Sequence, residues 1–460
     1  MTVRYVFYDT ETTGLSPVYD QIVQFAAIAT DHNFKKLDEI NIRCRRRKHI
    51  VPSPTAMLIT RTSPKALEEQ ELSHFEMAAN IASWIKLHTP SIWIGHNSLH
   101  FDEEFIRQTF YQNILNPYLT NRNGNLRADT MILTQALAHV DPNAIEVPQQ
   151  NGRHKFKLGL LAEANAINAD TQNLHDAYND VVATMLLAGL IKKTSRAVWG
   201  AMMQNADPTH VKKIIQEPHA ISVSGFVMGR PYSYSAVGLF ENPHNNNEYA
   251  VANLSMDLAD AKQGKSRREI SLIASKRARL IRANRMPIVF SDMSSKIIET
   301  PTAAKRKVAE YLKYFGQPER KANIKNYFDE KKDSRTDRDN VEENIYQAFP
   351  SRTDEKRMLS FASGSWEDRA ELVGEFEDQR LNELSSRLIC EYAGSLVPRY
   401  QMKRYETWVR GVINGKDKSD RRSIDSAIAE LETLPDEYPN RMSEIKDIRR
   451  YIRKLADQLG

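Results

Sequence analysis

Cysteine is almost absent from this chain of 460 residues: only Cys44 and Cys390 occur, far apart in the sequence. Neither belongs to a Cys-x-x-Cys pair, which argues against a disulfide framework and against a zinc site. Free thiols fit a reducing compartment. Long apolar runs are also lacking, because the longest charge-free apolar stretch, around VVATMLLAGLI, is far shorter than a membrane span. Since a predicted strand begins almost at residue 1, we expect no signal peptide and a cytoplasmic protein.

Charge of one sign is not in large excess either. The chain has 64 Lys and Arg against 59 Asp and Glu, a net charge of +5 and a pI of about 8.9. So mild an excess does not by itself indicate a nucleic-acid partner, and local clusters are more informative. With 41% hydrophobic and 27% charged residues, the composition is that of an ordinary globular protein. The length predicts roughly three domains.

Three successive patterns divide the chain. Residues 1–193 mix strand-like and helix-like segments, which predicts an α/β fold with helices packed on a mixed sheet. Between 196 and 348, short strand-like segments separated by turn clusters predominate. The polar residues 321–344 predict a loop or a poorly ordered segment. From 354 to 460 the pattern is helical throughout and rich in Glu, Arg, Lys and Leu.

The segment FYDTETTGL, residues 7–15, places two acids one residue apart at the end of a predicted strand. Side chains at positions i and i+2 of a strand point to the same face, so Asp9 and Glu11 converge on one spot. Two half-buried carboxylates repel each other, so the pKa of at least one of them rises or a proton is held between them. A divalent cation removes this repulsion, and Mg²⁺ prefers carboxylates together with phosphate oxygens. For a lone Asp-x-Glu, a solvated strand end is the ordinary alternative.

Further acids and a histidine occur near the starts of predicted helices. Asp102 in GHNSLHFD begins a predicted helix after a short strand, where a helix cap is the ordinary role. His175 and Asp180 would lie about 140° apart on a continuous helix and would not share a face. We therefore place His175 on the preceding loop and Asp180 in the first turns of the helix; a surface histidine is the alternative. Asp176 and Asp129 are expected to cap helices.

Taken in order, Asp-x-Glu, Phe-Asp and His-x₄-Asp resemble the motifs of the DEDDh exonucleases, a group of the ribonuclease-H-like fold. The five matching residues are Asp9, Glu11, Asp102, His175 and Asp180. Position 176 is Asp, where the tyrosine variant of the group has its aromatic residue, so the histidine variant is the match. The segments QFAAIATD, AMLITRTSP, FDEEFIRQTFYQNILNPY and HDAYNDVVAT are similar to bacterial exonuclease I. Beyond residue 193 the likeness is weaker, and ISVSGFVMG and FPSRTDEKRM match best.

This resemblance implies an architecture and an activity. The expected parts are a DEDDh exonuclease domain at 1–193, a small DNA-binding barrel like the Src-homology-three fold at 196–348, and an all-α C-terminal domain at 354–460. The implied activity is 3′-5′ degradation of single-stranded DNA to 5′-mononucleotides by a monomer, in DNA repair and recombination. Single-stranded-DNA-binding protein is an implied partner through its acidic tail, although the sequence does not place a pocket for it.

The resemblance also implies a mechanism with two Mg²⁺ ions, replaceable by Mn²⁺, about 3.5–4 Å apart. Asp9 would bridge both ions, Glu11 and Asp180 would complete the nucleophile-side site, and Asp102 would support the other. His175 would take a proton from the attacking water. The same resemblance predicts substrate contacts at Glu11, Thr12, Arg107, Tyr118 and Lys157.

Two basic runs fit a groove for a DNA strand. RCRRRKH at 43–49 has five Arg or Lys, and residues Lys262–Arg285 have nine basic residues and one acid. We expect both to contact phosphates, which gives affinity independent of base sequence, with a solvated face as the alternative for each. Tyr232, Tyr234 and Trp366 could stack on bases, with a place in the hydrophobic core as the alternative for each.

Two other functions share the same motifs. A proofreading or RNA-trimming exonuclease would use the same five residues, but such relatives are mostly shorter than this chain. A nucleic-acid-binding scaffold with an inactive nuclease fold is a different class, and the presence of all five catalytic residue types argues against it.

Overall fold

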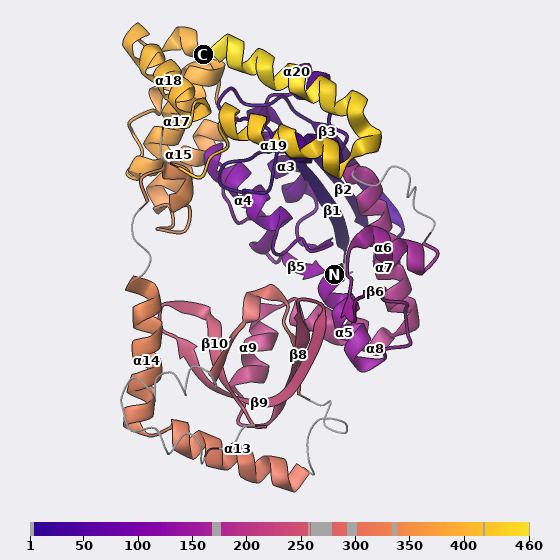
Figure 1. Cartoon of the computed structure of the whole chain (residues 1–460). Helices are drawn as coiled ribbons and strands as arrows, with labels where there is room; N and C mark the ends of the chain where they lie inside the picture. Colours follow the sequence, from indigo (N-terminus) through magenta and orange to yellow (C-terminus); the bar gives the residue numbers. More distant parts are fainter. Residues whose placement is uncertain are drawn as a thin grey trace. The chain divides into compact units, whose positions relative to one another are not determined.

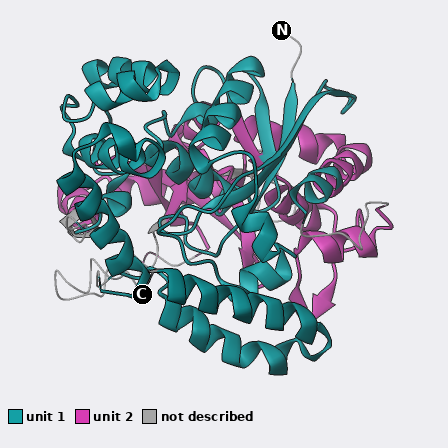
Figure 2. Cartoon of the chain, turned by 90° about the horizontal axis from the view of Figure 1, so that it is seen from above, with its two compact units in different colours: residues 1–125, 172–182, 337–460 teal, residues 126–171, 183–336 magenta. Residues whose placement is uncertain are grey.

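The computed structural model describes residues 4–167, 176–255, 258, 278–291, 301–333, 338–416 and 419–459 (Figure 1). The chain forms two compact units, shown in different colours in Figure 2. Unit 1 comprises residues 1–125, 172–182 and 337–460, and unit 2 comprises residues 126–171 and 183–336. These units do not coincide with the three segments 1–193, 196–348 and 354–460, whose boundaries stay a prediction.

The first sheet is mixed and has five strands in the order β3-β2-β1-β4-β5, of which the first four lie in unit 1 and β5 is Leu126–Asp129. Strand β1 is antiparallel to β2 and parallel to β4. The bounds are β1 Tyr5–Thr12, β2 Ile22–Thr30, β3 Lys36–Arg43 and β4 Ile92–Gly95. The strands expected at the start of the chain are thereby confirmed, and β1 extends far enough to include both acids of the Asp-x-Glu pair.

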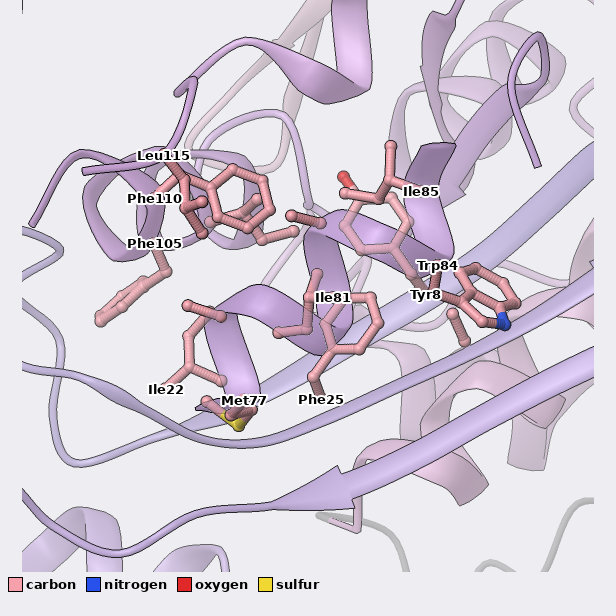
Figure 3. Close-up of a cluster of buried hydrophobic side chains, with 14 of the residues drawn as sticks. Tyr8, Ile22, Phe25, Met77, Ile81, Trp84, Ile85, Phe105, Phe110 and Leu115 are labelled. Carbon is pink, nitrogen blue, oxygen red and sulfur yellow. The ribbon is translucent and has the colours of Figure 1, made fainter. Parts of the chain in front are cut away.

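Helices α3 (His74–Leu87) and α4 (Asp102–Gln112) pack on one face of this sheet. Tyr8 of β1 and Phe25 of β2 share a buried hydrophobic cluster with side chains of both helices, among them Ile81 and Phe110 (Figure 3). Helix α3 begins with a capping box, in which Ser73 and Glu76 exchange hydrogen bonds with each other's backbone N–H groups. Because side chains alternate along a strand, Tyr8 faces the helices and its neighbour Asp9 belongs to the opposite face.

The C-terminal part of the chain is helical, as expected, and belongs to unit 1. Its helices pack on the segment that carries the sheet. Val23 and Leu58 share a buried cluster with Leu431 and Ile452, and Phe75 shares another with Leu384. The helices are α15 Arg352–Ser363, α16 Trp366–Glu371, α17 Gln379–Tyr392, α18 Arg399–Ile413, α19 Ile424–Glu437 and α20 Met442–Leu459, and the N-terminal segment adds α1 Pro54–Ile59 and α2 Pro64–Glu68.

In the basic run at 43–49, Arg46 and Arg47 have mostly buried side chains and form ion pairs within the protein, so the expectation of phosphate contacts is wrong for these two residues. Arg47 forms an ion pair of 2.8 Å with Glu391 of α17, and the two side chains are only 4% and 3% exposed. Arg46 donates to the Tyr451 hydroxyl of α20 at 3.0 Å and pairs with Glu68. These arginines bind the C-terminal helices to the sheet segment, a role that a charge pattern cannot distinguish from binding DNA.

A second sheet lies in unit 2 and is antiparallel, with strand order β11-β10-β9-β8-β12. Its strands are β8 Ile221–Val227, β9 Arg230–Asn242, β10 Asn245–Asn253, β11 Ala278–Arg282 and β12 Ile288–Phe290. The short strands expected in this part are therefore present. A barrel like the Src-homology-three fold stays a prediction.

Helices are more abundant in unit 2 than the sequence indicated. The stretch 196–348, expected to consist mainly of strands, also contains α8, α9, α13 and α14. Helix α14, Pro318–Asp333, occupies much of the polar stretch 321–344 that was expected to be a loop. Ile324 and Phe328 explain the error, because these two buried residues, four positions apart, are enough to anchor an otherwise polar helix. Among the described residues, the helices that lie wholly in unit 2 are α5 Thr130–Val140, α6 Leu158–Ala164, α8 Arg196–Asn205, α9 Pro208–Gln216, α13 Pro301–Phe315 and α14.

Helix α7 (Ala177–Thr194) begins in unit 1 and ends in unit 2. It contains the most apolar stretch of the sequence. None of the helices within the described residues combines the length and the hydropathy that crossing a membrane requires.

The buried pair of Arg47 and Glu391 predicts a large effect of mutation on stability. We expect Glu391→Ala to lower the free energy of unfolding by about 3–5 kcal/mol, because it leaves a buried guanidinium without its partner. Arg47→Met combined with Glu391→Leu should cost less, since neither charge then remains. Denaturant unfolding followed by circular dichroism measures both.

The matched control is Asp447→Ala, which removes the partner of Arg450 in a pair whose side chains are 58% and 82% exposed. Its effect should stay within about 1 kcal/mol. Equal losses in Glu391→Ala and Asp447→Ala would contradict a stabilising role of the buried pair.

Candidate active site

Asp9 and Glu11 lie on the face of β1 opposite the α3–α4 core. In the antiparallel pairing with β2 they stand across from Ala26 and Gln24, and the register shifts directly after Glu11. Ala26 has no side chain long enough to fill the space beside Asp9, so the two carboxylates dominate this end of the strand. The convergence predicted from the i, i+2 spacing is therefore present.

The first turn of α7 brings a third acid to the pair. Carboxylate oxygens of Asp9, Glu11 and Asp180 lie within 4.8 Å of one another. This is a set of hard oxygen donors of the kind that Mg²⁺ or Ca²⁺ binds, and it fits a divalent cation better than it fits three unneutralised charges.

Asp102 reaches the same strand from the other side. It begins α4, and its carboxylate accepts hydrogen bonds from the Thr10 backbone N–H at 3.0 Å and from the Thr10 hydroxyl at 2.7 Å. The carboxylate is thereby held against β1 between the two acids of the pair. Asp102 is not the N-cap that the ordinary reading suggested, since Phe101 occupies that position.

The pKa values of Asp9 and Glu11 reflect their burial and the short distances between the carboxylates. Burial raises the pKa of Asp9 well above its usual range, and the charges of Asp102 and Asp180 raise it further. Burial, followed by the charges of Asp180 and Asp102, raises the pKa of Glu11 to about 8. Without a cation, these carboxyls hold protons at pH values where ordinary carboxyls are ionised.

The start of α7 is fixed to the sheet by a polar network that the sequence did not reveal. Asp176 accepts from the Tyr178 backbone N–H, which confirms its predicted capping role, and it also pairs with Arg43 at 2.5 Å. Gln24 donates to Asp176 at 3.2 Å and accepts from the Ala177 backbone N–H at 3.3 Å. These contacts determine where Asp180 lies. The one available signal was Gln24 itself, a single polar residue inside the apolar strand IVQFAAIAT.

The other residues predicted from the sequence differ in burial and in their hydrogen-bond partners. His175 lies outside the described residues. Asp129 caps α5 by accepting from the Met131 backbone N–H, as expected. Thr12 is buried and donates its hydroxyl hydrogen to the Gly14 carbonyl at 2.7 Å. Lys157 is exposed at the start of α6 in unit 2.

Arg107 and Tyr118 lie together. The Arg107 guanidinium is 5.4 Å from the centre of the Tyr118 ring and contacts Glu103 and Glu104 at 3.8 and 3.7 Å. Phe349, which is 70% exposed, packs beside the same ring. Substrate contacts at Thr12, Lys157, Arg107 and Tyr118 stay predictions.

The remaining expectations for DNA contacts fall partly outside the described residues. Of the basic run Lys262–Arg285, residues 262–277 are not described, and Arg282 lies 3.7 Å from Glu248. Tyr234 is mostly buried and stacks with Tyr232. Trp366 packs on Phe75 at 5.1 Å, as a core aromatic does.

Glu11 predicts a pH-dependent stability in metal-free protein. Its pKa is about 8 when folded and near the ordinary 4.5 when unfolded, so between these values the native state holds a proton that the unfolded chain releases. Native stability therefore falls as the pH rises through this window. In EDTA, Glu11→Gln should have a higher melting temperature than wild type at pH 8.5 and nearly the same one at pH 5.

Thermal unfolding of both proteins across pH 5–9 measures the effect. Glu163→Gln, on the exposed side of α6, is the control and should follow the wild-type curve. Mg²⁺ should stabilise wild type more than Glu11→Gln, because a cation that binds only the native state adds to its stability. Parallel curves for wild type and Glu11→Gln would contradict the repulsion.

Comparison with known proteins places this geometry in a family. The family model described as Exonuclease matches residues 6–188, and the model described as Exonuclease I C-terminal domain matches residues 339–455. Together the two matches cover well over half of the chain. Exodeoxyribonuclease I of Haemophilus influenzae is 28% identical over 405 residues, which are 83% of this chain and 84% of that protein. Exodeoxyribonuclease I of Escherichia coli is 30% identical over 262 residues, 55% of this chain and about half (54%) of that protein.

Solved structures show the same fold over the whole length. Exonuclease I from Methylocaldum szegediense superposes with a TM-score of 0.85 at 21% identity, covering 98% of this chain and 99% of that one. Escherichia coli exonuclease I in complex with a dT13 oligonucleotide gives a TM-score of 0.83 at 22% identity, covering 98% and 100%. The predicted α/β exonuclease fold is confirmed, and the chain belongs to the exonuclease I family.

Proposed function

We propose that this chain is a 3′-5′ exonuclease that degrades single-stranded DNA to 5′-mononucleotides by metal-assisted hydrolysis with two ions. The observation that carries the proposal is the cluster of Asp9, Glu11 and Asp180, whose carboxylate oxygens lie within 4.8 Å of one another. Family membership supports an exonuclease activity. The named relatives are exodeoxyribonucleases, and one of the similar structures is a complex with an oligonucleotide of thymidine.

The acids fit a divalent cation on physical grounds. Burial and mutual repulsion raise the pKa values of Asp9 and Glu11, so the free site is electrostatically unfavourable when it is ionised. Asp9, Glu11 and Asp180 would hold Mg²⁺, with Asp102 in support, and bound Mg²⁺ would neutralise charge on the scissile phosphate and activate water.

The protein's own groups orient the reaction. Thr10 holds Asp102 in place through two hydrogen bonds, and the contacts of Asp176 with Arg43 hold the start of α7. His175 immediately precedes Asp176 in the sequence. In this proposal its imidazole accepts the proton of the attacking water, a role that suits a pKa near 6.5.

End-labelled substrates test the proposed activity. With Mg²⁺, we expect a 3′ label on single-stranded DNA to be released first as a mononucleotide, a 5′ label to be released last, and EDTA to stop both. Duplex DNA and RNA of the same sequence should be degraded far more slowly. Asp9→Asn should abolish cleavage and leave binding of the strand largely intact.

Release of a 5′ label first, or full activity in EDTA, would overturn the proposal. Faster degradation of RNA than of DNA would instead support the RNA-trimming alternative.

The proposed role of His175 predicts a specific change in the rate and in its pH dependence. A positioned base typically contributes about 10²–10⁴-fold to the rate, so His175→Ala should lower kcat on single-stranded DNA by an amount in that range at neutral pH. The loss should shrink at high pH, where hydroxide is abundant. Asp176→Asn is a useful comparison, because it weakens the fixation of α7 without removing the imidazole. An unchanged rate and pH profile in His175→Ala would show that the histidine is structural.

A further inference from the structure

A cavity of about 520 Å³ lies between α17 and α18 in unit 1, formed by residues that the catalytic proposal does not use. We call it the α17–α18 groove and define it by Gln379, Asn382 and Ser386 of α17 with Tyr400, Arg404 and Tyr405 of α18. Its volume is in the range of sites that hold a small molecule or one to two nucleotides.

Side-chain contacts join α17 to α18 at the groove. Gln401 of α18 donates to the Ser386 hydroxyl of α17 at 2.9 Å, which joins the two helices. The Arg387 guanidinium lies 4.0 Å from the centre of the Trp408 ring and pairs with the buried Glu342 at 2.7 Å. The charge of Arg387 is therefore compensated within the protein, and these residues shape the cavity.

The rim carries uncompensated positive charge. Helix α18 has Arg399, Lys403, Arg404 and Arg410 against the single acid Glu406. In the part of the chain that the structure describes, none of these four cations forms an ion pair. They are exposed, which distinguishes them from the arginines at 45–47, whose charges are bound internally.

Two tyrosines add groups that recognise more than charge. Tyr400 is 76% exposed at the groove, so its ring is accessible to a ligand. Tyr405 is 6% exposed, and its buried hydroxyl has no hydrogen-bond partner among the described residues. Burial of such a donor without a partner is unfavourable, and this hydroxyl lies inside the protein, so the exposed Tyr400 is the ring that a ligand can reach.

We propose that the α17–α18 groove is an auxiliary binding site for single-stranded DNA, separate from the cluster of acids. The exposed ring of Tyr400 suits stacking with a base, and the Gln379 side-chain N–H groups at the same cavity can donate to a base edge. Arg404, with Arg399 and Lys403 beside it on α18, suits the phosphates. An acidic protein segment would match the charge, but it offers no base to stack on the exposed ring of Tyr400. The inference rests on the proposed function for its ligand.

The test is binding of fluorescein-labelled dT30 in EDTA, measured by anisotropy at several salt concentrations. Tyr400→Ala with Arg404→Ala should weaken binding by about 5-fold or more, as expected for the loss of one stacked base. The slope of log affinity against log salt should flatten by about 0.7 for the one phosphate contact removed. Tyr400→Phe should bind like wild type, because stacking does not need the hydroxyl.

Arg453→Ala, on the exposed side of α20, is the matched charge control and should leave both affinity and slope nearly unchanged. In Mg²⁺, the double variant should keep kcat at saturating dT30 and raise KM, since Asp9, Glu11 and Asp180 are untouched. A strand containing 5-iododeoxyuridine should form a photo-cross-link to a peptide that includes Tyr400.

The outcomes separate this inference from the proposed function. If wild type neither binds nor degrades dT30, the proposed function is wrong. If wild type does both and the double variant matches it, the groove does not bind DNA. Loss of affinity for a polyglutamate peptide with unchanged binding of dT30 would also overturn the inference and would show that the groove binds an acidic protein segment.

Discussion

Repulsion among carboxylates is the constraint on which the architecture of unit 1 depends. Asp9, Glu11 and Asp180 come within 4.8 Å of one another, and burial raises the pKa values of the first two. Left alone, such a cluster would relax by moving a strand end or a helix. The surrounding structure prevents this movement, so the acids keep the positions that suit a cation. As a consequence, the metal-free protein is expected to be less stable at high pH.

Neighbouring polar residues hold Asp102 and the start of α7 in place. Thr10 gives two hydrogen bonds to Asp102, and Arg43 with Gln24 fixes Asp176 one turn before Asp180. None of these supporting residues is an acid of the motif. The site thus combines acids whose oxygens suit a divalent cation with neutral or basic residues whose contacts lie within the protein.

Positive charge has two different uses in unit 1. The arginines at 45–47 face inward, where Arg47 meets Glu391 and Arg46 meets Tyr451, and they join the C-terminal helices to the sheet segment. The cations of α18 face solvent beside an exposed tyrosine. Burial and available partners, which are properties of the folded state, decide whether a basic residue stabilises the protein or binds a ligand.

The sequence by itself determined the local order of this protein. The strand periodicity placed Asp9 and Glu11 on one face, the order of motifs identified the family, and the C-terminal helices followed from their pattern. The tertiary structure alone decided the partners: Arg43 and Gln24 act on Asp176 across more than 130 residues, and Arg47 meets Glu391 across 344. Helix α14 was not predicted for the same reason, because its few apolar residues stabilise a helix only by packing against the sheet. Spacing along a chain reports which residues share a face, whereas pairing over long distances depends on packing that no local pattern contains.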